Sequence, residues 1–124
     1  MDKKNTLRGK DKIKGLVPVL VSPMNEDETI DEEGVERLSQ FILSYPHFKA
    51  VWTLATAGED ENLPSAIIDD YTRLFVKYFG NKIPVLVKTS TPGTNSTIER
   101  TKRMADMGIH AAIVHFQHKM MSQD

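Results

Sequence analysis

The residues from Thr53 to Leu63 are the part of this sequence whose types and spacing could do chemistry. An apolar run from Phe48 to Leu54 leads into small residues and Gly58, and Pro64 then opens a helical stretch. A strand that ends in small residues brings backbone N–H groups close to whatever lies at its carboxyl end, where α/β proteins bind ligands. The stretch therefore predicts a loop that binds an anion. A tight turn between a strand and a helix, without any ligand, would have the same sequence features.

The elements that must position this loop follow one another in the order β-α-β-α-β-α-β. Apolar runs predict strands over residues 15–22, 48–54, 83–89 and 110–116, and amphipathic stretches between them predict three helices. Strand starts lie roughly 30 residues apart, the size of a βα unit, which predicts a parallel sheet with right-handed crossovers. A doubly wound open sheet and part of a (β/α)8 barrel both fit this pattern.

Local signals place the ends of these elements. Asp31 is a good N-cap for the first helix, and Ser96 with Glu99 forms a capping box for the third. The first strand, 15–22, is apolar almost throughout, which predicts burial on both faces. Pro18 within it lacks an N–H group and favours a position at the edge of the sheet.

Composition and charge narrow the class of protein. The 124 residues suit one small domain, and the lack of cysteine fits a cytoplasmic protein. Residues 1–14 carry six Lys or Arg against two Asp, whereas the whole chain has a net charge of −1. We expect a basic flexible arm over 1–14 and one domain over 15–124, with no nucleic-acid binding because the domain is acidic. No apolar run approaches the roughly 18 residues of a membrane span, and the polar start is not a secretory signal.

Several separate motifs together resemble the dihydrodipicolinate synthase / N-acetylneuraminate lyase family. The similarity runs from about Gly15 to Phe116. It rests on GLVPVLVSPM at 15–24, Ile30-Asp31, Ala57-Gly58-Glu59 with Leu63, IPVLV at 83–87, Thr97, and ADMG at 105–108. The resemblance implies a truncated TIM barrel, a (β/α)4 half-barrel with parallel strands.

The resemblance also implies class I aldolase chemistry, a lyase or synthase reaction on pyruvate or another 2-oxo acid. In the family, a lysine on a later strand forms a Schiff base with the 2-oxo acid, and the protonated imine accepts electrons while a neighbouring C–C bond forms or breaks. The lysine and its proton-relay tyrosine would lie beyond Asp124. We therefore expect this chain to be inactive alone, and to need no cofactor and no metal ion.

The implied site residues are Thr56 and Ala57. Thr56 matches a hydroxyl that takes part in the proton relay and whose N–H helps to bind the 2-oxo acid carboxylate. Ala57 replaces a second hydroxyl that binds the same carboxylate, a loss on the order of 1–3 kcal/mol if the carboxylate is buried. Where the family has a Pro-Tyr-Tyr run after the fourth strand, this chain has Phe116, Gln117 and His118.

Four other features have a structural and a chemical interpretation. Lys88 could be a nucleophile inside a barrel, but a strand-end lysine that reaches solvent is the simpler expectation. His115 and His118 point to opposite sides of one strand and so predict no metal site. The carboxylates 59–61 are expected to be a solvated helix entry, and Trp52 is expected to lie in the core.

Two functions therefore remain open from the sequence. The chain is either the N-terminal piece of a Schiff-base lyase or synthase, or a non-catalytic half-barrel that serves binding or oligomerisation. Unpaired sheet edges predict self-association into a homo-oligomer in both cases. Treatment with pyruvate and borohydride separates the two, and from the sequence we expect no adduct.

Overall fold

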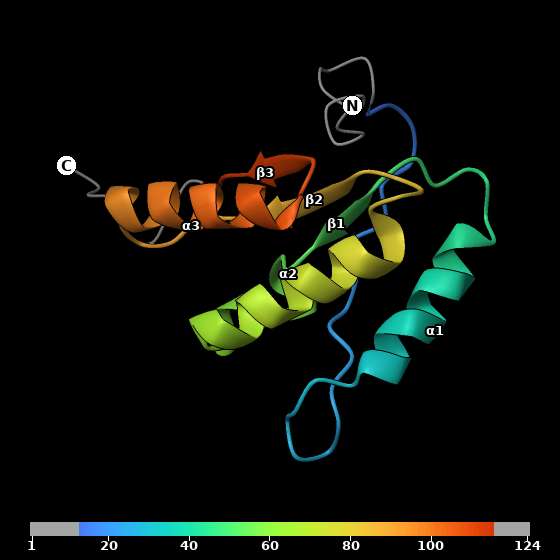
Figure 1. The fold of residues 1–124 in the computed structure, drawn as a ribbon, viewed down its shortest axis with the longest axis horizontal. Helices are drawn as coiled ribbons and strands as arrows, with labels where there is room; N and C mark the ends of the chain where they lie inside the picture. Colours follow the sequence, from blue (N-terminus) through green and yellow to red (C-terminus); the bar gives the residue numbers. More distant parts are fainter. Residues whose placement is uncertain (1–12, 116–124) are drawn as a thin grey trace.

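The fold is a run of βα units in which each strand lies next to the one before it in the sequence (Figure 1). The structure is a computed structural model, and it describes residues 13–115. Two short 3-10 helices, η3 and η4, follow β1. The elements are α1 Glu32–Leu43, β1 Val51–Thr53, η3 Thr56–Gly58, η4 Asp60–Asn62, α2 Ser65–Phe79, β2 Val85–Lys88, α3 Thr94–Met107 and β3 Ala111–Ile113.

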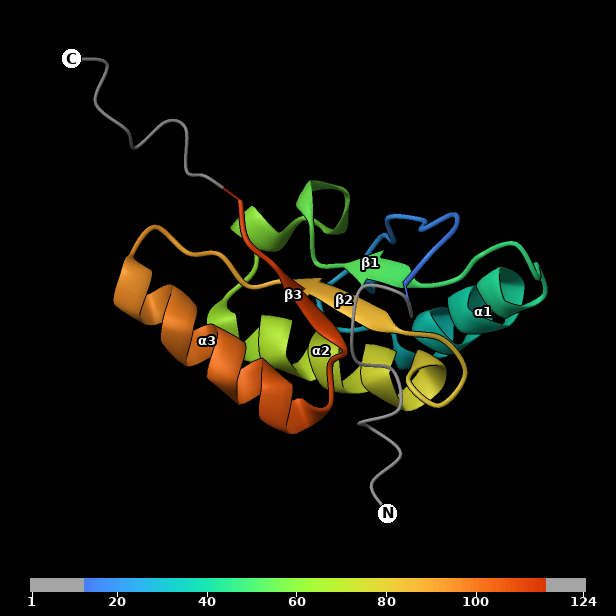
Figure 2. The same ribbon diagram turned by 90° about the horizontal axis from the view of Figure 1, so that it is seen from above.

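The sheet is parallel, as predicted, with the order β1-β2-β3. Figure 2 shows the three helices on one side of the strands and the turns after β1 on the other. A doubly wound sheet has helices on both faces and a strand order that reverses, whereas a barrel has sequential strands with every helix outside. The arrangement is therefore that of an arc of a (β/α)8 barrel.

The first predicted strand, 15–22, is present only as an extended segment. It runs parallel to β1 through isolated bridges, Leu16 to Phe48 and Val19 to Trp52, and the Leu20 N–H donates to the Trp52 carbonyl at 2.9 Å. Pro18 has no N–H to give, although its carbonyl accepts from Trp52. Pro18 therefore lies in a segment at the edge of the described sheet, as its missing N–H group predicted.

The prediction that residues 15–22 are buried on both faces was wrong. Leu16, Val19 and Val21 are 63%, 42% and 55% exposed. The segment has a neighbouring strand only on the β1 side within the described residues, so its apolar side chains have nothing further to pack against. The opposite edge of the sheet also lacks a neighbouring strand within the described residues, and Val114, just after β3, is 63% exposed there.

The core lies between the sheet and the helices. Val51, Val85 and Val87 share one face of the sheet and are fully buried against the aromatic stripe of α2. Tyr71 and Phe75 from that stripe are also fully buried, as the helical periodicity predicted. We call this the outer face of the sheet, and the opposite side, which carries Trp52, Leu86, Lys88, Ala111 and Ile113, the inner face.

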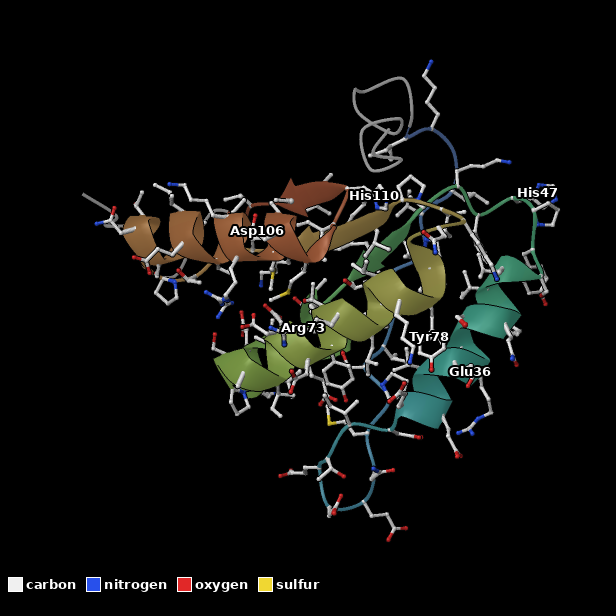
Figure 3. The ribbon with its side chains drawn as sticks, viewed as in Figure 1. Glu36, His47, Arg73, Tyr78, Asp106 and His110 are labelled. Carbon is white, nitrogen blue, oxygen red and sulfur yellow. The ribbon has the colours of Figure 1, made fainter. Side chains whose placement is uncertain are left out.

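Helix α1 is held against α2 by polar contacts at the surface. Glu32 accepts hydrogen bonds from the Lys77 ammonium at 2.9 Å and from the Tyr78 hydroxyl at 3.0 Å. Figure 3 shows Tyr78 projecting from α2 toward α1, where Glu36 lies one turn after Glu32. These bonds lower the pKa of Glu32, chiefly through the Lys77 bond.

The helix starts agree with the sequence in two cases out of three. Asp31 caps α1 by accepting from the Gly34 N–H at 2.9 Å, and Pro64 precedes α2. The predicted capping box of α3 was wrong, because α3 already begins at Thr94 with Gly93 at its N-cap. Ser96 instead donates to the Gly93 carbonyl at 3.0 Å, so its hydroxyl closes the preceding turn.

Several expectations fall partly or wholly outside the described residues. Most of the proposed arm 1–14 and the positions Phe116, Gln117 and His118 lie there. Within the described residues, no helix is both long and apolar enough to cross a membrane.

Candidate active site

The turn after β1 starts from an unusual backbone conformation. Leu54 is fully buried and has a φ of 55°, in the left-handed region that bulky residues avoid. This conformation bends the chain out of β1 directly into η3, and Glu59, with a φ of 59°, bends it again into η4. Such backbone conformations cost about 1–3 kcal/mol each and concentrate at functional sites.

The two site residues predicted from the sequence lie at the exposed start of this turn. Thr56 and Ala57 are the first two residues of η3, and both are exposed. Within residues 13–115, neither of their backbone N–H groups donates to a protein acceptor. The turn therefore presents two adjacent free donors at the carboxyl end of a parallel strand, a geometry suited to a carboxylate or another anion.

Gly58 fixes the turn to the first strand segment. The Ser22 hydroxyl donates to the Gly58 carbonyl at 2.7 Å in a buried contact. A Cβ at position 58 would lie 3.0 Å from Ser22 Oγ and 3.3 Å from the Leu20 carbonyl oxygen. A larger residue at position 58 would therefore have to displace Ser22 by a few tenths of an ångström, so glycine lets the turn pack closely against the first strand segment.

An ion pair buried on the inner face lies next to the turn. Lys88 Nζ is 2.8 Å from Asp60 Oδ2, and the two side chains are 4% and 10% exposed. The expectation that Lys88 reaches solvent was therefore wrong, as was the expectation that the carboxylates 59–61 are all solvated. Lys88 follows Leu86 by two positions, so it points to the inner face, and the η4 helix places Asp60 above it.

Trp52 is not part of the core, contrary to expectation. It lies on the inner face, half-buried, with its ring edge-to-face against His115 at 5.5 Å between centroids. Its indole Nε1 is buried without a hydrogen-bond partner in the structure. His115 is exposed, and its backbone N–H donates to the Ser90 hydroxyl at 3.3 Å. Among the described residues, no three His, Cys, Asp or Glu side chains are grouped to hold a metal ion.

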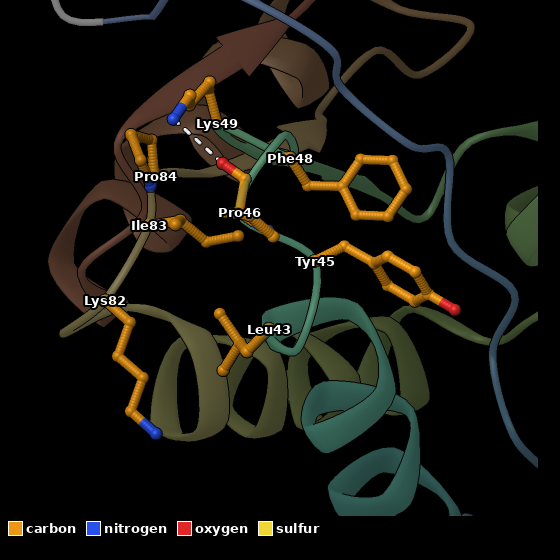
Figure 4. Close-up of a pocket in the computed structure, with 8 residues that line it drawn as sticks. All are labelled: Leu43, Tyr45, Pro46, Phe48, Lys49, Lys82, Ile83 and Pro84. Carbon is orange, nitrogen blue, oxygen red and sulfur yellow. Dashed lines mark hydrogen bonds between the residues drawn. The ribbon is translucent and has the colours of Figure 1, made fainter.

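A cavity lies away from this turn, at the amino ends of the strands (Figure 4). It measures about 540 Å³ and is lined by Leu43, Tyr45, Pro46, Phe48, Lys49, Lys82, Ile83 and Pro84. Figure 4 shows Lys49 turned back to the Pro46 carbonyl, to which its ammonium donates at 2.9 Å. In (β/α)8 barrels the amino end of the strands serves stability and the carboxyl end serves chemistry. We therefore assign the candidate site to the turn.

Thr56 and Ala57 were predicted from the sequence as site residues, and this remains a prediction. The residues that hold the turn around them were not predicted. Ser22 and Leu54 carry no signal in the sequence, because a hydroxyl bond across 36 residues and a left-handed leucine depend on the tertiary structure. Asp60 and Lys88 did carry a signal. Opposite charges that follow two neighbouring parallel strands end at the same edge of the sheet and can pair.

The fold and the turn define a class of protein: a parallel βα barrel segment with two exposed, unpaired backbone N–H groups at the end of one strand. The sequence matches the Dihydrodipicolinate synthetase family over residues 12–117. The chain belongs to this family.

Its relatives include enzymes named 4-hydroxy-tetrahydrodipicolinate synthase. Over 102 residues the chain is 32% identical to the 4-hydroxy-tetrahydrodipicolinate synthase of Stenotrophomonas maltophilia (strain R551-3), covering 82% of this chain and 34% of that protein. It spans about a third of the length of the relatives that it matches.

Two solved structures have the same fold in the shared region. The 4-hydroxy-tetrahydrodipicolinate synthase of Methylacidiphilum fumariolicum SolV superimposes with a TM-score of 0.78 at 22% identity, over 83% of this chain and 34% of that one. The chloride-inhibited dihydrodipicolinate synthase from Acinetobacter baumannii, complexed with pyruvate, gives 0.77 at 24% identity, over 82% and 35%. The chain is thus a partial TIM barrel, as the resemblance implied.

Proposed function

We propose that this chain supplies the carboxylate-binding part of a Schiff-base lyase or synthase that acts on pyruvate or another 2-oxo acid. The observation that carries the proposal is the pair of free N–H groups of Thr56 and Ala57 at the carboxyl end of β1. The family supports it, and so does the fact that the relative from Acinetobacter baumannii was solved with pyruvate. The lack of cysteine agrees with a cytoplasmic protein.

In this proposal the turn binds the substrate and the rest of the barrel completes the catalysis. The two N–H groups hold the 2-oxo acid carboxylate, and the Thr56 hydroxyl takes part in proton transfer. Ala57 offers its N–H but no hydroxyl, so affinity for the carboxylate is lower than with a threonine. Because the chain spans a third of its relatives, we propose that it does not complete an aldol reaction alone.

A pyruvate titration followed by amide NMR tests the proposal. Pyruvate should shift the amide signals of Thr56, Ala57 and Gly58 in the 124-residue chain, whereas acetone, which lacks the carboxylate, should not. Ala57→Thr should tighten binding about two- to tenfold by adding one hydrogen bond. Thr56→Ser, which keeps the hydroxyl, is the matched control. Amides of the turn that stay unshifted at saturating pyruvate would overturn the proposal.

The exposed edges favour a second function, a half-barrel that associates with itself. Val21 at one edge and Val114 at the other are 55% and 63% exposed. Parallel strands with unpaired edges and exposed apolar side chains promote pairing with another chain. Such pairing is compatible with ligand binding, since the turn lies at the carboxyl end of the strands and the edges run along their sides.

A further inference from the structure

Two arginines of α3 lie against one serine of α2. The two helices are neighbours on the outer face of the sheet (Figure 2). Arg100 Nη2 lies 3.4 Å from the Ser65 hydroxyl oxygen, and Arg103 Nη2 lies 3.5 Å from the same atom. Ser65 is exposed and both arginines are half-buried, so the hydroxyl that they share remains accessible. The two guanidinium groups therefore converge on one accessible point of the surface.

Arg103 is held in this orientation by a carboxylate. Its Nε donates to Asp69 Oδ2 at 2.9 Å, and its Nη2 donates to Asp69 Oδ1 at 3.2 Å. Asp69 follows Ser65 by four positions and so lies on the same face of α2, one turn further on. Both bonds use one edge of the guanidinium group, and Nη1 has no protein acceptor among the described residues. The ion pair thus fixes Arg103 at this point while leaving it donors to give.

Arg100 has no carboxylate of its own. Within residues 13–115, its side chain has one hydrogen-bond acceptor, the Ser65 hydroxyl at 3.4 Å. This is a long bond to a neutral group, whereas a guanidinium group carries five N–H donors. Burial lowers the pKa of Arg100, and the neighbouring charge of Arg103 lowers it further. Arg100 is therefore a cation beside another cation, with most of its donors unused.

The charges around this hydroxyl do not cancel. Asp69 and Asp60 both attract Arg100. Asp69, however, already pairs with Arg103. Asp60 already pairs with Lys88, at 2.8 Å. Three cations therefore face two carboxylates, and one positive charge is left without a counterion in the part of the chain that the structure describes.

A phosphoryl group matches these donors in charge and in geometry. Guanidinium groups donate paired N–H bonds to phosphate oxygens, and such charge-assisted bonds are roughly twice as strong as neutral ones. A phosphoryl group has enough oxygen atoms to accept from two guanidinium groups and a hydroxyl at once, which a chloride ion does not. Ser65 is also the first residue of the 15-residue helix α2, whose positive end adds to the attraction.

We propose that Arg100, Arg103 and the Ser65 hydroxyl bind the phosphoryl group of a small phosphate, either the inorganic ion or a phosphate monoester. Asp69 is a positioning residue of this site, because it orients Arg103. The inference goes beyond the proposed function and does not depend on it, since none of these residues belongs to the turn after β1.

A phosphate titration of the 124-residue chain, followed by NMR, tests the proposal. Inorganic phosphate should shift the Nε–H signals of Arg100 and Arg103 and the amide signal of Ser65, and these shifts should saturate. Sodium chloride at the same ionic strength should give no saturable shift. Arg100→Gln should weaken the affinity at least about tenfold, because charge-assisted bonds are lost. Lys102→Gln removes an exposed positive charge from the same helix and is the matched control, with a change below about twofold.

A second probe, methyl phosphate, identifies the form of the ligand. Binding at least as tight as that of inorganic phosphate would assign the site to an ester, and weaker binding would assign it to the free ion. Shifts that chloride reproduces, shifts that do not saturate, or an affinity that Arg100→Gln leaves unchanged would overturn the proposal. The Nε–H signals belong to the unsubstituted chain, so they decide even if a variant fails to fold. The pyruvate titration reads the amides of Thr56 and Ala57, and its outcome is therefore separate.

Discussion

The hydroxyl of Tyr71 in α2 donates a 2.6 Å hydrogen bond to the carbonyl oxygen of Pro23, 48 residues earlier. Tyr71 is fully buried. Pro23 directly follows Ser22, whose hydroxyl donates to the Gly58 carbonyl in the turn. One tyrosine thus ties the second helix to the segment that holds the candidate site.

Tyr71→Phe should lower the free energy of unfolding by about 1 kcal/mol, because one buried hydrogen bond is lost while the ring packing remains. Urea denaturation followed by circular dichroism measures the difference. Tyr45→Phe, which removes a hydroxyl from a half-exposed ring, is the control and should cost little. Equal effects of the two substitutions would show that the Pro23 contact contributes nothing.

The same residue makes the fold sensitive to alkali. Burial, together with the charges of Asp31 and Glu59, raises the pKa of Tyr71 from 10.0 to about 12. Between these two pH values the unfolded chain loses the Tyr71 proton and the folded chain keeps it, so the unfolded state gains stability. The contribution is complete below pH 10 and is lost as pH approaches 12. Tyr71→Phe should flatten this part of the stability curve, and an unchanged curve would contradict the assignment.

His110 should make the fold sensitive to mild acid. The Val85 N–H donates to His110 Nδ1 at 3.0 Å, and burial lowers the pKa of His110 below its ordinary 6.5. As pH falls through 6.5, the unfolded chain binds the proton first, so the free energy of unfolding should fall. His110→Asn, which keeps an acceptor but does not titrate, should reduce this slope between about pH 7 and 5. An unchanged slope in His110→Asn would contradict the assignment.

Asp31→Ala should destabilise the chain by about 1 kcal/mol, because the Gly34 N–H loses its acceptor at the start of α1. Asp31→Asn retains an oxygen in the same place and should recover most of the loss. Thermal unfolding of both variants measures the difference. Equal losses would mean that the negative charge, and not the cap, is what matters.

The Lys88–Asp60 pair should show strong coupling in stability. Lys88→Met leaves Asp60 as a buried unpaired charge and should cost about 3–5 kcal/mol, whereas the double variant Lys88→Met/Asp60→Leu should recover much of that loss. A double-mutant cycle by denaturant unfolding measures the coupling. Additive effects would show that the two side chains do not interact in solution.

The exposed edges should make the chain associate. Analytical ultracentrifugation should show dimers or larger species whose share rises with concentration. Val114→Lys, at the β3 edge, should reduce that share, because a charge at an exposed edge opposes pairing. Ile98→Lys changes an exposed residue on the helix α3 and serves as the control. A compact monomer at all concentrations would contradict this prediction.

The architecture could be predicted because it depends on local patterns. Apolar runs and helical stripes placed β1, β2, β3 and all three helices, and Asp31 and Pro64 marked two helix starts. The capping box of α3 failed because Gly93 begins the helix one turn earlier than Ser96 would. Ser96 lies three positions after Gly93, so the sequence is compatible with Ser96 either as the N-cap or inside the first turn of α3. The conformation of the turn at Gly93 determines which of the two occurs.

The site could be predicted only in part, for a different reason. Thr56 and Ala57 were predicted as site residues from the turn and the family resemblance, and their role stays a prediction. The burial of Lys88 was not, because it requires Asp60 from another loop to neutralise it and η4 to cover it. A pattern of single residues shows which side chains carry charge, but exposure is set by what packs over them.

The order of the strands also bears on how this chain becomes structured. Each strand pairs with the one synthesised just before it, and each helix returns the chain to the same side. Each pairing closes a loop of one βα unit, so its entropy cost is met within that unit and not across the whole chain. The units can thus form in succession while the polypeptide leaves the ribosome, and no unit has to wait for a distant partner before its own strand is paired on one side.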